Sequence, residues 1–112
     1  MPRIVADLAA TRPLDISFID GIETVTGGEG PWIQGLALAK PGVLILGTNG
    51  VTTDTVGAAV MGYDPRAPRG AKPFETCDNT LLLAEALGVG SADLSRIDVR
   101  GVPIAQVRYA FR

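Results

Sequence analysis

Histidine is absent from the 112 residues of this chain. The absence excludes the commonest general base, the usual catalytic triads and any zinc or iron site built on imidazole ligands of this chain. A metal site formed by this chain alone would be rich in oxygen ligands, and would therefore favour magnesium or calcium.

Cysteine and long hydrophobic runs are also scarce. The single Cys77 forms no internal disulfide and cannot hold an iron–sulfur cluster, which takes about four ligands, so no such cluster is expected from this chain alone. The longest apolar run, Val43–Leu46, is far shorter than the roughly 20 residues of a membrane span. No signal-peptide pattern is present, so the cytoplasm is the default location, although a signal on a longer parent chain stays open.

The chain lacks a basic surface as well. Its net charge of −2 and pI near 4.9 argue against a nucleic-acid partner. Four arginines near the end favour a solvated strand face instead: Arg96, Arg100, Arg108 and Arg112.

Periodicity predicts a single layered α/β domain over residues 1–112, with about four or five strands and three helices. The helices are expected over about residues 3–11, 52–61 and 78–88, and the strands over 14–18, 35–39, 43–47, 97–100 and 107–111. The continuous apolar run at 43–47 is typical of a strand that is covered on both faces. Strand order is not predicted.

Two polar, glycine-rich loops follow apolar strands, which is where open α/β sheets bind ligands. The first follows Asp20 and contains the cofactor-binding candidates Gly28, Glu29 and Gly30. It lacks the lysine and hydroxyl residue of a P-loop, so its glycines serve either tight turns or close approach to a ligand.

The second loop leads into the helix predicted from Thr52. The start of this helix suits an anion, with Thr48, Asn49 and Thr52 as candidate donors. Asp54 is predicted in the first turn, where it either complements the helix dipole or acts as a metal or proton ligand.

The carboxylates of Asp20, Glu29 and Asp54 are candidate ligands for a divalent cation, and Asp20 and Asp54 are candidate catalytic groups. General acid–base work needs a raised pKa in a dry pocket. For Asp20, which precedes Gly21, turn formation through its side chain is the competing interpretation.

Five segments in this order resemble the C-terminal part of the domain of unknown function 362 family, bacterial and archaeal proteins described as iron–sulfur-centre proteins. The segments are Val5–Leu8, Ile19–Ile22, Gly27–Pro31, Gly42–Pro65 and Leu81–Gly101.

The resemblance implies a longer parent protein with an N-terminal portion, which in some members carries ferredoxin-like cysteine motifs that this sequence lacks. The cleft residues that match the family pattern are Asp20, Gly21, Gly28, Gly30, Pro31, Asp54, Gly62 and Asp64. Asn49-Gly50-Val51 stands where the resemblance leads us to expect aspartate-proline-valine, and this departure is expected to weaken the start of the helix.

The preferred hypothesis is a ligand-binding or catalytic half-domain, whose cleft is completed by an N-terminal portion of the parent protein or by a partner subunit. The alternatives are a non-enzymatic structural or interaction lobe, with aromatic residues such as Trp32 and Tyr63 as anchors, and a part of a redox protein whose iron–sulfur cluster is supplied elsewhere. The sequence does not decide whether the chain is part of an enzyme.

Overall fold

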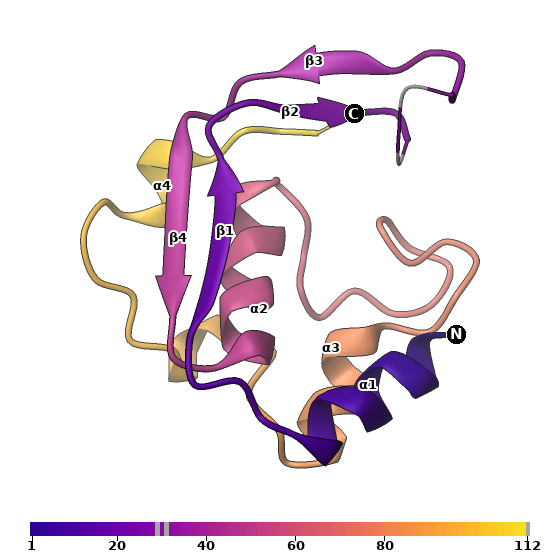
Figure 1. Cartoon of the computed structure of the whole chain (residues 1–112), viewed down its shortest axis with the longest axis vertical. Helices are drawn as coiled ribbons and strands as arrows, with labels where there is room; N and C mark the ends of the chain where they lie inside the picture. Colours follow the sequence, from indigo (N-terminus) through magenta and orange to yellow (C-terminus); the bar gives the residue numbers. More distant parts are fainter. Residues whose placement is uncertain (29, 31, 112) are drawn as a thin grey trace.

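Two antiparallel strands and one long helix form the centre of the computed structural model, which describes residues 1–28, 30 and 32–111 (Figure 1). The predicted apolar run forms β4 (Val43–Gly47), and β4 pairs with β1 (Ser17–Gly21). The register places Ser17 opposite Gly47 and Gly21 opposite Val43. Side chains alternate between the two faces of this ribbon, because successive residues of a strand point in opposite directions.

Helix α2 (Gly50–Val60) covers one face of the ribbon. The helix starts two residues before Thr52 because Asn49 is its N-cap: the Asn49 Oδ1 accepts the Thr52 N–H at 3.0 Å. Asp54 therefore lies in the second turn, and its predicted place in the first turn is wrong. The helix is buried along most of its length, since β1, β4, α3 and α4 all contact it.

Helices α1 (Pro2–Thr11) and α3 (Thr80–Ala86) pack against each other beside α2 (Figure 1). Helix α3 is capped by Asn79, one residue after the predicted Asp78, and is closed by Gly88, whose φ of 74° suits glycine. Small side chains allow the helices to approach closely at the core cluster, which consists of Ala6, Val51, Leu81, Ala84 and Ala92.

A second antiparallel ribbon joins β2 (Thr24–Thr26) to β3 (Ala37–Ala39). The rest of the chain contains the 3-10 helix η1 (Leu94–Arg96) and the short helix α4 (Ile104–Val107). Four strands and four α-helices among the described residues confirm the layered α/β class. None of the helices within the described ranges is long and apolar enough to cross a membrane.

The strands predicted over 97–100 and 107–111 are not present in the described part of the chain. Residues 97–100 have no neighbouring strand to pair with among the described segments. The last segment runs past the end of α2 instead, where the Tyr109 and Phe111 N–H groups donate to the Val60 and Met61 carbonyls at 2.8 and 3.0 Å. These bonds satisfy carbonyls that the end of a helix leaves unpaired.

Contrary to the prediction that β4 is covered on both faces, the described residues leave one face of the β1–β4 ribbon uncovered. Helix α2 covers the inner face, whereas Phe18, Leu44 and Leu46 are 59%, 55% and 70% exposed. Phe18 pairs with Leu46 and Asp20 pairs with Leu44, so these four residues share one side, which we call the outer apolar face. The sequence of β4 suits a covered strand, and the residues that the structure describes leave it half covered.

Candidate functional site

A pocket of about 380 Å³ lies where β1, β2, β4 and the second half of α2 meet, and we call it the Asp54 pocket. Its wall is mostly apolar, with Ile19 and Ile45 from the ribbon and Ala58 from the helix. Tyr63, Pro73 and Phe111 close it from the loop after α2 and from the C-terminal segment. An apolar pocket with few polar groups is typical of small-molecule sites.

Asp54 is the acidic group that α2 contributes to this pocket. Burial raises the pKa of the Asp54 carboxyl above its ordinary value, because the apolar wall disfavours the charged form. The residue as a whole is nevertheless exposed to solvent, so water relieves part of this penalty. Among the described residues, none forms a hydrogen bond or an ion pair with the Asp54 carboxylate. As far as these residues are concerned, both of its oxygens are free to bind a ligand.

Asp20 borders the same pocket on β1, but strand alternation directs its side chain to the outer apolar face. Its Oδ1 accepts the Ile22 N–H at 3.1 Å, which supports the competing interpretation of Asp20 as a turn former, while its catalytic role stays a prediction. The two candidate catalytic residues, Asp20 and Asp54, therefore border the same pocket, but their side chains lie on different sides of β1. A ligand would have to reach around the free edge of β1 to contact both carboxylates.

The structure describes two of the three predicted cation ligands, Asp20 and Asp54. Glu29 lies outside the described residues, as does Pro31, and the described ranges contain no group of three acidic or cysteine side chains that could hold a metal ion. Glu23, the next acidic residue after Asp20, forms an exposed ion pair with Lys40 at 2.7 Å. Metal binding by Asp20, Glu29 and Asp54 stays a prediction.

The glycines of the first loop have neighbours within the loop itself. A side chain at Gly28 would collide with Ile33, and one at Gly30, which is buried, would collide with the Trp32 ring. Both glycines thus allow the loop to pack on its own apolar side chains, and their predicted cofactor-binding role stays a prediction.

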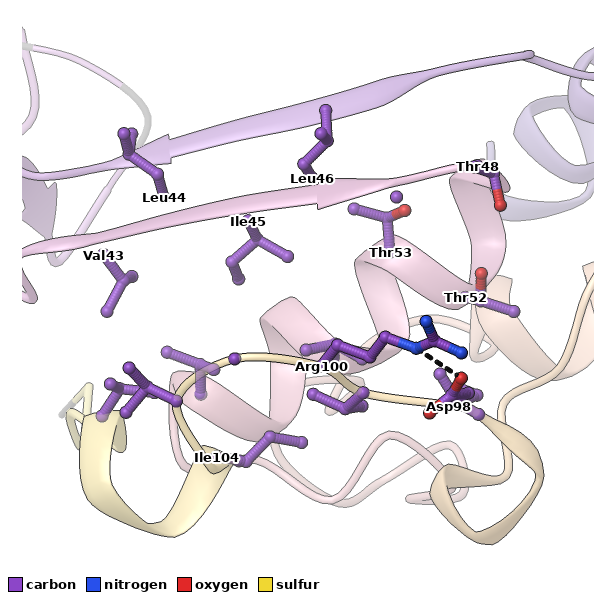
Figure 2. Close-up of a pocket in the computed structure, with 18 of the residues that line it drawn as sticks. Val43, Leu44, Ile45, Leu46, Thr48, Thr52, Thr53, Asp98, Arg100 and Ile104 are labelled. Atoms are coloured by element: carbon purple, nitrogen blue, oxygen red, sulfur yellow. Dashed lines mark hydrogen bonds and ion pairs between the residues drawn. The ribbon is translucent and has the colours of Figure 1, made fainter.

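A second hollow, of about 750 Å³, separates β4 from residues 97–101, and we call it the β4 slot (Figure 2). Val43 and Ile45 point into it, whereas Leu44 and Leu46 point to the opposite side of the strand. Its polar end is formed by Thr48, Thr52 and the pair of Asp98 and Arg100, whose charged atoms lie 2.9 Å apart (Figure 2).

Of the predicted anion-binding residues, Thr48 and Thr52 line this polar end, whereas Asn49 does not line it and is already engaged. Its Oδ1 accepts the Thr52 N–H, and its Nδ2 donates to the Val89 carbonyl at 2.6 Å. The Thr52 hydroxyl donates back to the Asn49 carbonyl at 3.0 Å. Thr48 is exposed at the rim and keeps a free hydroxyl among the described residues. The structure thus places Thr48 and Thr52 in one hollow and the two aspartates at another.

Comparison with protein-family models, with curated proteins and with solved structures finds no significant match. The resemblance to the domain of unknown function 362 family therefore stays a prediction from the sequence.

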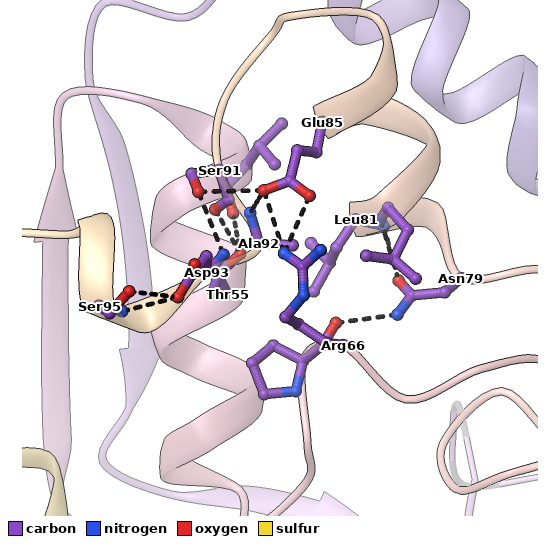
Figure 3. Close-up of polar contacts among 12 residues, drawn as sticks. Thr55, Arg66, Asn79, Leu81, Glu85, Ser91, Ala92, Asp93 and Ser95 are labelled. Carbon is purple, nitrogen blue, oxygen red and sulfur yellow. Dashed lines mark hydrogen bonds and ion pairs between the residues drawn. The ribbon is translucent and has the colours of Figure 1, made fainter.

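Sequence reasoning missed a polar cluster around Glu85 (Figure 3). The Glu85 carboxylate accepts the Ala92 N–H at 2.9 Å, the Ser91 hydroxyl at 3.1 Å and an Arg66 guanidinium N–H at 2.9 Å. It thereby joins α3 to the loops on either side of it. A signal was present: Glu85 is the one charged residue in the apolar helix Thr80–Ala86, and such a residue usually has a partner.

Replacing Asp54 by asparagine should stabilise the fold at neutral pH. Because the folded-state pKa is raised, the contribution of this carboxyl to stability is complete below the unfolded pKa and is lost as the pH rises through the folded pKa. We expect Asp54→Asn to melt at a higher temperature than the wild type at pH 7, with a gap that closes below about pH 4. Asp7→Asn, on the exposed side of α1, is the control and should show no such gap.

Glu85→Gln should have the opposite pH dependence. The Ala92 amide, then Arg66 and Ser91, hold the pKa of the Glu85 carboxyl below its ordinary value. Its stabilising effect is therefore present above the unfolded pKa, about 4.3, and is lost as the pH falls through the folded pKa. Thermal melts should show Glu85→Gln to be less stable at pH 7, and the difference should shrink toward pH 2. If Glu85→Gln differed from the wild type by the same amount at pH 7 and at pH 2, the lowered pKa of Glu85 would not explain the loss of stability. The exposed substitution Glu75→Gln is the matched control.

Proposed function

We propose that this chain forms one half of a ligand-binding or catalytic cleft, with Asp54 as its central polar group. The observation that carries the proposal is a carboxyl with a raised pKa and no described partner in a pocket that is otherwise largely apolar. Groups of this kind are enriched at functional sites, because a raised pKa suits proton transfer near neutral pH.

The chemistry of the pocket restricts the ligand class. The wall favours an apolar body, and the Asp54 carboxylate favours a hydrogen-bond donor or a positive charge on it. Asp20 would contact such a ligand only at the edge of β1. A divalent cation bridging Asp54 to a further oxygen ligand is the other occupant consistent with the predicted oxygen-rich site.

The bare side of the ribbon supports the second part of the proposal, that another segment completes the cleft. A strand with the sequence Val-Leu-Ile-Leu is normally covered on both faces, and the outer apolar face is left exposed by the described chain. The order of segments that resembles the domain of unknown function 362 family agrees with this, since members of that family have an N-terminal portion. An iron–sulfur cluster would have to come from that portion, because this chain has one cysteine.

A ligand titration followed by amide NMR shifts tests the proposal. The probes are benzylammonium chloride, magnesium chloride and calcium chloride, each added to the wild type and to Asp54→Asn, Asp20→Asn and Asp7→Asn. We expect one probe to shift resonances at Ile19 and Ala58, with at least about tenfold weaker binding to Asp54→Asn and unchanged binding to Asp7→Asn. No shift in the pocket with any probe, or equal binding by a folded Asp54→Asn variant, would overturn the proposal.

A non-enzymatic interaction lobe is the second candidate, and the exposed aromatic residues favour it. Trp32 is 78% exposed and Phe18 is 59% exposed, and aromatic side chains are frequent anchors of interfaces. Under this candidate the outer apolar face and the exposed Trp32 would carry the function, and Asp54→Asn would leave every partner interaction unchanged. Sedimentation of a Phe18→Ser variant beside the wild type would show whether this face drives association.

A further inference from the structure

Tyr63, predicted from the sequence as an anchor of an interaction lobe, lies in the wall of the Asp54 pocket. Its side chain is half-buried, whereas Trp32, the other predicted anchor, is 78% exposed. The Tyr63 hydroxyl forms no hydrogen bond with another described residue. A tyrosine hydroxyl in largely apolar surroundings usually has a hydrogen-bond partner. Within the described chain, this hydroxyl is therefore available to a molecule in the pocket.

The end of α2 fixes the place of Tyr63 relative to the helix. The Gly62 N–H donates to the Ala59 carbonyl and the Tyr63 N–H donates to the Ala58 carbonyl, both at 3.0 Å. Gly62 has a φ of 88°, the left-handed conformation that this helix-ending motif requires. The Arg108 guanidinium donates to the Gly62 carbonyl at 3.0 Å. These bonds hold Tyr63 next to the last turn of the helix, beside Ala58.

Asp54 lies on the same side of α2 as Ala58, since residues four apart are neighbours on a helix surface. Both residues border the pocket, as does Met61, seven residues after Asp54. At a rise of about 1.5 Å per residue, Asp54 lies about 6 Å along the helix axis before Ala58. The pocket thus has a carboxylate near the middle of α2 and a tyrosine at the end of α2.

Apolar side chains line the pocket between these two polar residues. Ile19 and Ile45 come from the ribbon, and Phe111 comes from the C-terminal segment. The other hydroxyl of the lining belongs to Thr24, which lies on β2 and shares no element with Asp54. The volume of about 380 Å³ is within the range of small-molecule sites.

We propose that the ligand of the Asp54 pocket is a small amine with an apolar body and a hydrogen-bond acceptor at its far end, which the Tyr63 hydroxyl recognises. The Asp54 carboxylate accepts from the ammonium group, and the Tyr63 hydroxyl donates to the acceptor. An amine without the acceptor leaves this hydroxyl unpaired in the pocket and binds less tightly. The inference rests on the proposed function and adds the group that the ligand carries opposite its charge.

Two matched probes test the inference: para-acetylbenzylammonium, whose ketone is an acceptor, and para-isopropylbenzylammonium, which has a similar size and no acceptor. Amide NMR shifts give both affinities for the wild type and for Tyr63→Phe, which removes only the hydroxyl. We expect the affinity of the acetyl probe relative to the isopropyl probe to fall about fivefold in Tyr63→Phe, because one neutral hydrogen bond is lost. Tyr109→Phe, outside the pocket lining, is the matched control and should leave this ratio unchanged.

Asp54→Asn separates this inference from the proposed function, because it should weaken both probes by at least about tenfold. An unchanged ratio in a folded Tyr63→Phe variant, while Asp54→Asn still weakens both probes, would overturn the inference and leave the proposed function standing. An equal fall of the ratio in Tyr109→Phe would overturn the inference as well. If neither probe bound, or if Asp54→Asn bound both as tightly as the wild type, the inference and the proposed function would fail together.

Discussion

Asn79→Ala should lower the free energy of unfolding by about 3 kcal/mol, which is a large share of the stability of a small domain. The side chain is 4% exposed and uses both of its polar atoms. Its Oδ1 caps α3 by accepting the Leu81 N–H, and its Nδ2 donates to the Pro65 and Ala67 carbonyls at 2.8 and 2.9 Å. The substitution leaves these groups without a partner in a buried place. Urea unfolding at pH 7 measures the loss.

Asn79→Asp separates the two roles of this residue. Aspartate keeps the size and the capping oxygen but cannot donate to Pro65 and Ala67 when ionised. We expect it to lose at least half of the stability that the alanine variant loses, because a carboxylate would face two carbonyl oxygens. An Asn79→Asp variant as stable as the wild type would show that the link to the loop before α3 contributes nothing.

Gly90→Ala should also be strongly destabilising, by about 1–3 kcal/mol. A side chain there would collide with the Asn49 amide and would lie 2.7 Å from Val51 Cβ, so the chain after α3 could no longer approach the start of α2. The clash would also disturb the Asn49 cap and its bond to Val89. The measurement is again the free energy of unfolding.

Gly50→Ala is the contrasting change at the same end of α2. Its nearest neighbours would be Leu14 Cδ1 at 3.4 Å and Ser17 Oγ at 3.5 Å, and the residue is helical, so alanine should stabilise the chain by about 0.5 kcal/mol. If Gly50→Ala and Gly90→Ala changed the stability in the same direction, the close approach of Gly90 to Asn49 would not explain the effect.

Local patterns predicted the elements that local forces determine. The apolar run of β4, the periodicity of α1 and α2 and the glycine that closes α3 all lie where the sequence indicates. The start of α2 was misplaced because Thr52 and Thr53 can also cap a helix, and only the contact of Asn49 with the distant Val89 shows which residue is used. The predicted strand at 97–100 is absent because a strand needs a neighbour, and none of the described segments provides one.

The candidate site was only partly predictable for a related reason. Asp54 was identified from its place after a polar loop, but the pocket whose burial raises its pKa is built partly by residues far from it in the sequence, such as Ile19 and Phe111. The separation of Asp20 from Asp54 depends on strand parity, since a shift of one residue in β1 would turn Asp20 to the inner face. No spacing rule in the sequence fixes that parity.

The state of the Asp54 carboxyl is the most direct test of the account. A carbon-13 NMR titration of the aspartate carboxyls, assigned by comparison with Asp54→Asn, reports its pKa within the folded chain. The account predicts that Asp54 titrates clearly above the ordinary aspartate value of about 3.9. A pKa for Asp54 at or below that value would show that the pocket does not disfavour its charge, and would contradict the central claim.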